Sequence, residues 1–271
     1  MSDPSLPRGF RLLLWSALLC FPVLTATLAI TTFLGFWNSL FLAFLLELLP
    51  VLAVVQIPLV GAGSVPRIPA YVGSGLVILS LGLLGLGLGS GVVGASAMGF
   101  DLIGLSQLAT WTVVLTVAAM ALVGVFHLLG RLLGVRESRL LLELLPRTRG
   151  EKLHFTGLSL CAGFGEEMAY RGYAIAVLAP IVGNVWGAAV LSSCVFGLLH
   201  AYQGALGVVR TGLLGLILAA SFILAGSLWP AIIAHTAVDL IGGLVLGERM
   251  LGSLEEEEPA SEADVRTTEE E

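Results

Sequence analysis

The chain has 271 residues, of which 57% are hydrophobic and only 12% are charged. A soluble domain has about 25% charged residues, so this composition excludes an ordinary water-soluble protein and indicates an integral membrane protein. The formal net charge of −6 comes largely from acidic residues near the C-terminus, and it argues against nucleic acid as a partner.

Long apolar runs predict an all-α, multi-pass membrane protein of about eight transmembrane helices. Each run is long enough, or nearly long enough, to cross the hydrocarbon layer as a helix. In chain order the runs cover residues 12–36, 40–60, 71–94, 107–133, 153–179, 185–201, 206–225 and 229–246.

The runs and the polar segments between them divide the chain into four parts. Residues 1–11 are an N-terminal lead, and residues 12–152 are an N-terminal membrane half that ends in a basic connection at 131–152. Residues 153–246 are a second membrane half with most of the polar motifs. The acidic tail, 253–271, has too few apolar residues to fold, so we expect it to be disordered.

Basic residues predict the orientation of the helices. With eight spans, every Lys and Arg except Arg171 lies in or at the edge of connections on one side of the membrane. The positive-inside rule makes that side cytoplasmic. We therefore expect both termini in the cytoplasm, and a prokaryotic cytoplasmic membrane fits best.

Two features of the first half bear on packing. Gly85/Gly89 and Gly87/Gly91 have the GxxxG spacing that permits close approach of helices in lipid. Glu47 is an acid within the second apolar run, where it has either a structural role or a place in the lining of a cavity.

The segment 165–172 places three charged residues in an apolar run. Charges inside a membrane are costly and mark functional sites by default. Glu167 and Arg171 are at i and i+4 on a helix, which predicts an ion pair between them. Glu166 lies about 100° around the helix from Glu167 and has no partner in its own segment.

Two later helices supply candidate partners for Glu166. His200 lies one turn after Phe196, and His235 and Asp239 are again at i and i+4. Convergence on one polar cavity would satisfy all of these groups. The set suits activation of water, with Glu166 as general base and donors that stabilise the oxyanion of an attacked peptide carbonyl.

Other classes of protein fit the same residues. One Glu and two His are sufficient ligands for a catalytic zinc, although HExxH is absent. A non-catalytic membrane scaffold or immunity protein could keep the set for packing. A transporter or proton relay would be favoured by internal symmetry, and the two halves show no convincing repeat.

Three ordered motifs resemble those of the CPBP family. This is the CAAX-protease and bacteriocin-processing family of intramembrane glutamic endopeptidases, which includes type II CAAX prenyl endopeptidases and abortive-infection proteins. The resemblance covers about residues 153–246. The motifs are EExxxR (Glu166, Glu167, Arg171), FxxxH (Phe196, His200) and HxxxN/D (His235, Asp239).

The resemblance implies roles for these residues and no cofactor or metal. Glu166 and His200 would activate water, and His235 and Asp239 would form the oxyanion hole. Glu167 and Arg171 would form the structural ion pair, and Phe196 would support the cavity. Asp239 stands where eukaryotic members of the family have Asn and many prokaryotic members have Asp. An ionised Asp would repel an oxyanion. It is then either protonated or orients His235 from behind, and we favour the second role.

We therefore expect an intramembrane endopeptidase with a polar cavity that opens toward the cytoplasm. Its partners would be the lipid bilayer and a membrane-associated protein or peptide, cleaved near its C-terminus or in a membrane-adjacent segment. Whether the substrate is prenylated stays open, and the sequence carries no signal for an oligomeric state. If the helices were straight, Glu166, His200 and His235 would lie at different depths. Either the fifth helix starts with an interfacial stretch, or the eighth is tilted or broken near Pro230.

Overall fold

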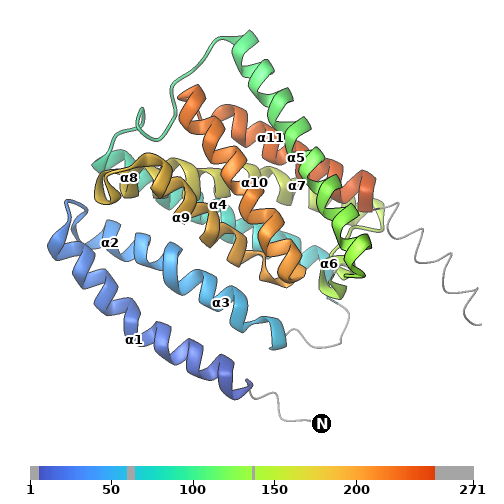
Figure 1. The fold of residues 1–271 in the computed structure, drawn as a ribbon, viewed down its shortest axis with the longest axis horizontal. Coiled ribbons are helices and arrows are strands. Elements are labelled where there is room, and N and C mark those ends of the chain that lie inside the picture. Colours follow the sequence, from blue (N-terminus) through green and yellow to red (C-terminus); the bar gives the residue numbers. More distant parts are fainter. Residues whose placement is uncertain (1–5, 60–64, 136–137, 248–271) are drawn as a thin grey trace, which may run out of the picture.

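The computed structural model describes residues 6–59, 65–135 and 138–247, and their regular elements are all helices (Figure 1). The predicted acidic tail, 253–271, lies outside the described residues. Labels η1, η3 and η5 denote π-helical segments, and η2 and η4 denote 3₁₀ turns. In chain order the elements are α1 (Arg8–Thr31), α2 (Gly35–Ala43), η1 (Phe44–Leu48), α3 (Leu49–Val55), η2 (Ile57–Leu59), α4 (Arg67–Val92), α5 (Leu105–Leu133), α6 (Arg139–Glu143), α7 (Arg149–Glu166), η3 (Glu167–Ile175), α8 (Ala176–Val182), α9 (Val185–Leu199), η4 (Ala201–Gln203), α10 (Gly204–Ala225), α11 (Trp229–Leu240) and η5 (Ile241–Leu246).

Six helical stretches among the described residues are long and apolar enough to cross a membrane. Two predicted spans fall outside this set. The run at 153–179 corresponds to α7, η3 and α8, where several charged residues interrupt the apolar sequence, and the run at 185–201 corresponds to α9, which has only 15 residues. The protein is therefore an integral multi-pass membrane protein, while the count of eight spans stays a prediction.

Prolines in the apolar runs are accommodated without breaking the helices. Pro50 lies in the first turn of α3, directly after the π-helical segment η1. The fifth run was predicted to end at residue 179, before Pro180, and the helix is longer than predicted. The helix continues to Val182 and ends at Gly183, whose φ of +73° is the left-handed conformation that glycine adopts readily at a helix C-terminus.

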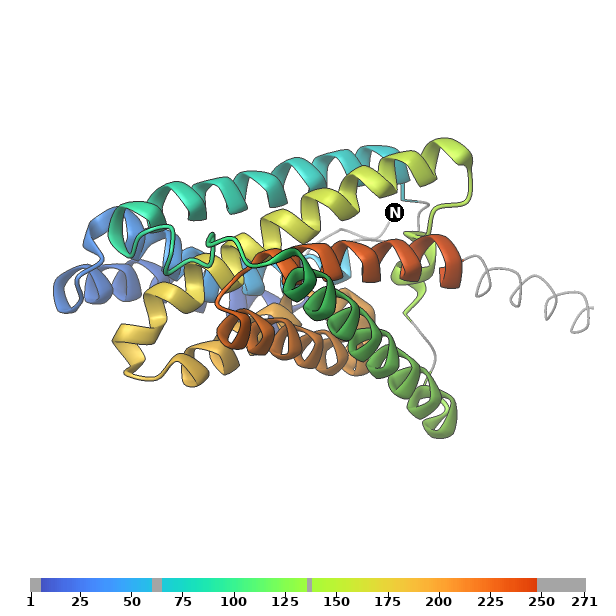
Figure 2. The same cartoon turned by 90° about the horizontal axis from the view of Figure 1, so that it is seen from above.

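The helices form a bundle with α1 on its outer edge. Figure 1 shows α1 beside the continuous helix made by α2, η1 and α3, away from α5 and α11. Figure 2 shows α4 and α7 running together along one side of the bundle. Helix α7 also packs against α11, and it is therefore held between two neighbours.

Glycines allow α4 and α7 to approach to backbone contact. A Cβ on Gly82 would lie 2.6 Å from the Cα of Gly165, so neither position has room for a side chain. Farther along α4, a Cβ on Gly85 would lie 3.2 Å from the Cβ of Tyr173. Small residues at such crossings allow the van der Waals contact that holds helices together in lipid.

The two predicted GxxxG pairs of α4 have different surroundings. Gly85 and Gly89 face protein, and a Cβ on Gly89 would lie 2.9 Å from the Tyr173 ring. A Cβ on Gly87 or Gly91 would meet nothing within 4 Å. The spacing alone could not distinguish the face of α4 that packs from the face that does not.

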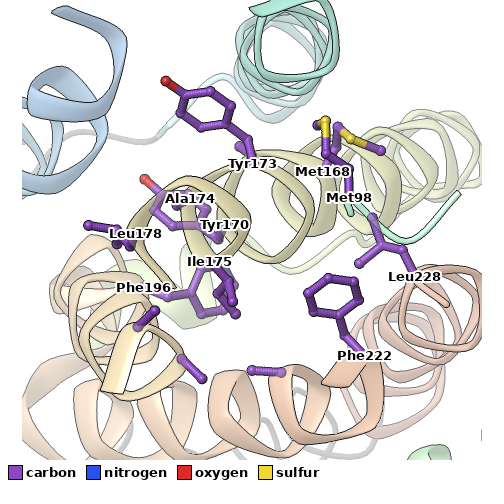
Figure 3. Close-up of a cluster of buried hydrophobic side chains, with 14 of the residues drawn as sticks. Met98, Met168, Tyr170, Tyr173, Ala174, Ile175, Leu178, Phe196, Phe222 and Leu228 are labelled. Carbon is purple, nitrogen blue, oxygen red and sulfur yellow. The ribbon is translucent and has the colours of Figure 1, made fainter. Parts of the chain in front are cut away.

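The core is centred on η3, in which all nine residues are buried. Figure 3 shows side chains of η3 surrounded by residues of other elements, including Met98, Phe196, Phe222 and Leu228. The Tyr173 hydroxyl donates a hydrogen bond to the backbone oxygen of Asn38 at 2.9 Å. This buried segment directly follows Glu166, and its packing fixes the position of that residue.

The start of α7 is fixed by a capping box and by α4. The Thr148 side chain accepts from the backbone N–H of Glu151, while the Glu151 carboxylate accepts from the backbone of Thr148. Arg67 of α4 also pairs with Glu151 at 3.3 Å and donates to the backbone oxygen of Glu143 at 2.6 Å. The short helix α6, at Arg139–Glu143, lies in the basic connection before α7.

Candidate active site

The junction of α7 and η3 meets α11 at a single histidine. The Nδ1–H of His235 donates to Oε1 of Glu167 at 2.7 Å. We assign the proton to Nδ1 because an ionised carboxylate only accepts hydrogen bonds. The opposite ring nitrogen, Nε2, lies 3.7 Å from Oε2 of Glu166. Both members of the adjacent glutamate pair therefore face His235, one at each side of its ring.

Asp239 lies on the same side of His235 as Glu166. Its Oδ2 is 3.7 Å from Nε2 of His235. The expectation that Asp239 orients His235 stays a prediction, and Asp239 does not lie behind the ring, opposite Glu166. Glu167 holds that position through its short bond to Nδ1. The interpretation of Glu167 as only a partner of Arg171 was incomplete for the same reason.

The predicted Glu167–Arg171 contact is present and buried. Nη1 of Arg171 lies 2.8 Å from Oε1 of Glu167, the same oxygen that accepts from His235. The Arg171 guanidinium also lies 4.2 Å from the ring centroid of Phe196, which is a cation–π contact. A buried charge needs such partners, because desolvation costs several kcal/mol for each ion.

Phe196 joins the two histidines. Its ring centroid is 4.8 Å from that of His200 and 6.2 Å from that of His235. Nδ1 of His200 lies 2.9 Å from the backbone oxygen of Phe196, so it donates to that oxygen. In this tautomer, Nε2 of His200 has an unshared pair that can accept a proton or a hydrogen bond.

Close packing of α7 against α11 sets the register of these contacts. A Cβ on Gly163 would lie 2.9 Å from the backbone oxygen of Ile232 and would collide with the Thr236 hydroxyl. Glu166 follows Gly163 by three residues, and His235 follows Ile232 by three. Gly163 thus lets the backbones of α7 and α11 approach each other about one helical turn from the place where Glu166 faces His235.

The structure also bears on the different depths expected for the site residues. Helix α7 begins at Arg149, before the apolar run, so several turns precede Glu166. Pro230 lies in the first turn of α11, where proline is tolerated, and that helix is unbroken there. Helix α9 is short and ends at Leu199, directly before His200. Of the two alternatives, a break near Pro230 is absent, and a long stretch of α7 before Glu166 is present.

Burial varies in a regular way across the site. The side chains of Glu167 and Arg171 are 0% and 1% exposed, and those of His235 and Glu166 are 11% and 16% exposed. Asp239 is 34% exposed. The ion pair is therefore the least exposed part of this group of residues, and Glu166 and Asp239 are more exposed.

Other residues considered as site members lie outside the contacts around His235. Glu47 is on η1, and its Oε2 is buried without a hydrogen-bond partner among the described residues. No group of three or more His, Cys, Asp or Glu with the arrangement of a metal site occurs in the described part of the chain.

Tyr202 is a neighbour of the site that the sequence motifs did not identify. Its ring centroid lies 5.9 Å from that of His200, with an angle of 36° between the ring planes. Its hydroxyl interacts electrostatically with Glu166 and Asp239. The signal in the sequence was only its place two residues after His200, at the start of a polar segment.

One protein-family model matches the chain over residues 149–241, and its description is type II CAAX prenyl endopeptidase Rce1-like. A search of curated proteins and a search of solved structures gave no match. The matched segment begins at the first residue of α7 and includes the EExxxR, FxxxH and HxxxD motifs. Residues 149–241 are therefore similar to the Rce1-like type II CAAX prenyl endopeptidases, which agrees with the family resemblance of the three motifs.

Proposed function

We propose that the protein is an intramembrane endopeptidase in which Glu166 activates the water that cleaves a peptide bond. The arrangement around His235 supports this function best. A buried carboxylate lies at one ring nitrogen, and two more accessible carboxylates lie at the other. Such an arrangement gives one acid a fixed structural partner and leaves another, Glu166, available for proton transfer.

In the proposed reaction, Glu166 removes a proton from water while the water oxygen bonds to the carbonyl carbon of the substrate. Nε2 of His200 accepts the second water hydrogen in a hydrogen bond and orients the nucleophile. The carbonyl double bond opens to an oxyanion. The carbon–nitrogen bond then breaks, and Glu166 returns its proton to the leaving amine. The products are a new carboxyl terminus and a new amino terminus.

His235 stabilises the oxyanion in this mechanism. With carboxylates near both ring nitrogens, His235 would carry an N–H group at each nitrogen. Nδ1–H is fixed on Glu167, which leaves Nε2–H for the developing negative charge. Asp239 lies near the same nitrogen, and we propose that it holds the imidazolium when no oxyanion is present.

The proposed setting is a membrane of eight spans with a cytoplasm-facing polar cavity. Helix α7 carries charges at its start and α9 is short, yet both lie within the bundle beside helices long enough to span. The basic connections support cytoplasmic termini by the positive-inside rule, and we propose a prokaryotic cytoplasmic membrane. The substrate would be a membrane-associated protein or peptide with its scissile bond near its C-terminus or beside the membrane.

Mapping protein C-termini in cells tests the function even when the substrate is unidentified. Cells that express the wild type are compared with cells that express Glu166→Gln at equal protein level. We expect a set of new C-termini that depends on the wild type, because glutamine cannot accept the proton from water. Identical C-termini in both strains would contradict the proposal and favour a non-catalytic scaffold.

A chelator distinguishes the proposed mechanism from a zinc protease with the same residues. The purified protein is assayed on a synthetic peptide that spans a cleavage site found in the cellular comparison. We expect cleavage to be unchanged after treatment with EDTA or 1,10-phenanthroline. Loss of cleavage that returns on addition of zinc would contradict the glutamate mechanism.

A further inference from the structure

The turn after His200 contains a chain of hydrogen bonds that runs toward the site. Nη2–H of Arg210 donates to Oε1 of Gln203 at 3.0 Å. Nε2–H of Gln203 in turn donates to the hydroxyl oxygen of Tyr202 at 3.2 Å. The Thr211 hydroxyl also donates to Oε1 of Gln203, at 3.4 Å.

The direction of this chain is fixed by the arginine. A guanidinium has donors and no acceptor, so the group of Gln203 that faces it must be the carbonyl oxygen. The amide nitrogen of Gln203 then faces Tyr202 and donates to its oxygen. Because Tyr202 receives a hydrogen bond from this side, its own O–H is left to donate elsewhere, and the received bond strengthens it as a donor.

The surroundings of Tyr202 indicate where that hydroxyl acts. Its ring lies beside His200, and its backbone oxygen accepts from the Ser138 hydroxyl at 2.6 Å, which fixes the turn. The negative charges of Glu166 and Asp239 both act on the hydroxyl, which agrees with a place for it on this side of the site. These are the two acids that flank Nε2 of His235, the nitrogen assigned above to the oxyanion.

We propose that Tyr202 is a further catalytic residue, whose hydroxyl donates a hydrogen bond to the oxyanion opposite His235, and that Gln203 and Arg210 position it. This inference rests on the proposed endopeptidase function. An oxyanion bound by one imidazolium donor has room for a second donor, and two donors are a common arrangement for this charge. Gln203 and Arg210 act only through Tyr202, so they are positioning residues.

Removal of the hydroxyl tests the proposal directly. Tyr202→Phe keeps the ring beside His200 and deletes only the donor. We expect kcat on the synthetic cleavage-site peptide to fall by roughly 10- to 100-fold with KM nearly unchanged, because the oxyanion exists only in the transition state. The matched control is Tyr71→Phe, which deletes a hydroxyl that donates to the backbone oxygen of Leu144 at 2.7 Å, away from the site. Its kcat should stay within about twofold of wild type.

Reversal of the hydrogen bond between Gln203 and Tyr202 gives a sharper test. A glutamate in Gln203→Glu still accepts from Arg210, but it also accepts from the Tyr202 hydroxyl and turns that hydrogen away from the site. We expect a loss of kcat close to that of Tyr202→Phe. In the Tyr202→Phe background, Gln203→Glu should cause no further loss, since no hydroxyl is left to redirect. A glutamate that acted only through its charge would lower kcat in both backgrounds.

The outcomes separate this inference from the function on which it rests. A Tyr202→Phe protein with wild-type kcat, while Glu166→Gln is inactive, would overturn the role of Tyr202 alone. Equal losses of activity and folded protein in Tyr202→Phe and Tyr71→Phe would assign Tyr202 a structural role instead. An active Glu166→Gln protein would overturn the endopeptidase mechanism itself.

Discussion

Two Arg–Glu pairs of this protein have the same spacing and the same N–O distance in opposite surroundings. Arg139–Glu143 and Arg171–Glu167 are both separated by four residues on a helix, and both have an N–O distance of 2.8 Å. The Arg139 side chain is 75% exposed, whereas that of Arg171 is 1% exposed. An exposed pair contributes ~0–1 kcal/mol to the stability of the fold. Loss of one partner from a buried pair destabilises the fold far more, because the other charge is then buried without a partner or water.

The comparison teaches that spacing predicts contact and burial decides its consequence. Glu143 has water as an alternative partner, so its ion pair is replaceable. Glu167 has only Arg171 and His235 in the described contacts, and one carboxylate oxygen serves both. The buried pair therefore links the stability of the bundle to the orientation of a proposed catalytic histidine.

The largest effect is expected when the buried pair loses its carboxylate, and the exposed pair serves as the control. Glu167→Ala should lower the free energy of unfolding by about 3–5 kcal/mol, because Arg171 becomes an unpaired buried charge. Cleavage should be lost as well, since His235 loses its fixed orientation. Glu143→Ala should cost less than about 1 kcal/mol and leave cleavage unchanged. Thermal unfolding in detergent measures the stability of both variants. An equal loss of stability in the two variants would refute the comparison.

A medium effect is expected from methyl groups added to α7. Gly163→Ala places a Cβ against the backbone of α11, and the overlap should cost roughly 1–3 kcal/mol and separate Glu166 from His235. A Cβ on Gly157 would meet nothing within 4 Å on the same helix. Gly157→Ala should therefore be neutral or stabilise by up to ~1 kcal/mol, through helix propensity. Equal stability and activity of Gly163→Ala and Gly157→Ala would show that close packing does not set the register of α7 against α11.

The smallest effect is expected at the exposed start of α7, as a dependence on pH. Hydrogen bonds from the backbone N–H groups of Thr148 and Arg147 lower the pKa of Glu151 from 4.5 to about 2. Because the folded pKa is the lower one, the stabilisation is full above pH 4.5 and is lost as the pH falls toward 2. Glu151→Gln should remove this dependence and about 1 kcal/mol at neutral pH. An unchanged acid profile of thermal unfolding would contradict the capping role.

The sequence predicted features that depend on local periodicity. Apolar runs placed the long helices, as for the run at 71–94, which is α4 at Arg67–Val92. Spacings of four residues predicted the contacts of Glu167 with Arg171 and of His235 with Asp239, because a helix brings such side chains together. The convergence of distant helices was inferred from the cost of isolated polar groups in lipid.

Features set by the crossing of helices could not be predicted in the same way. The bond between Glu167 and His235 depends on the register of α7 against α11, which arises from the close approach at Gly163. The segment that begins at Glu167 is also π-helical rather than α-helical. No periodicity in the sequence marks either feature. Tyr202 lies in the short 3₁₀ turn η4, and no periodicity in the sequence predicts its position either.

Cleavage of one peptide by purified Glu166→Gln tests the central claim most directly. The peptide spans a cleavage site of the wild-type protein, and both proteins are compared at equal folded concentration. The account predicts a rate lower by roughly 10²–10⁴-fold, with a thermal unfolding midpoint close to that of the wild type, because the general base is lost while its shape is kept. A rate within about twofold of wild type would contradict the account, since glutamine cannot act as the base.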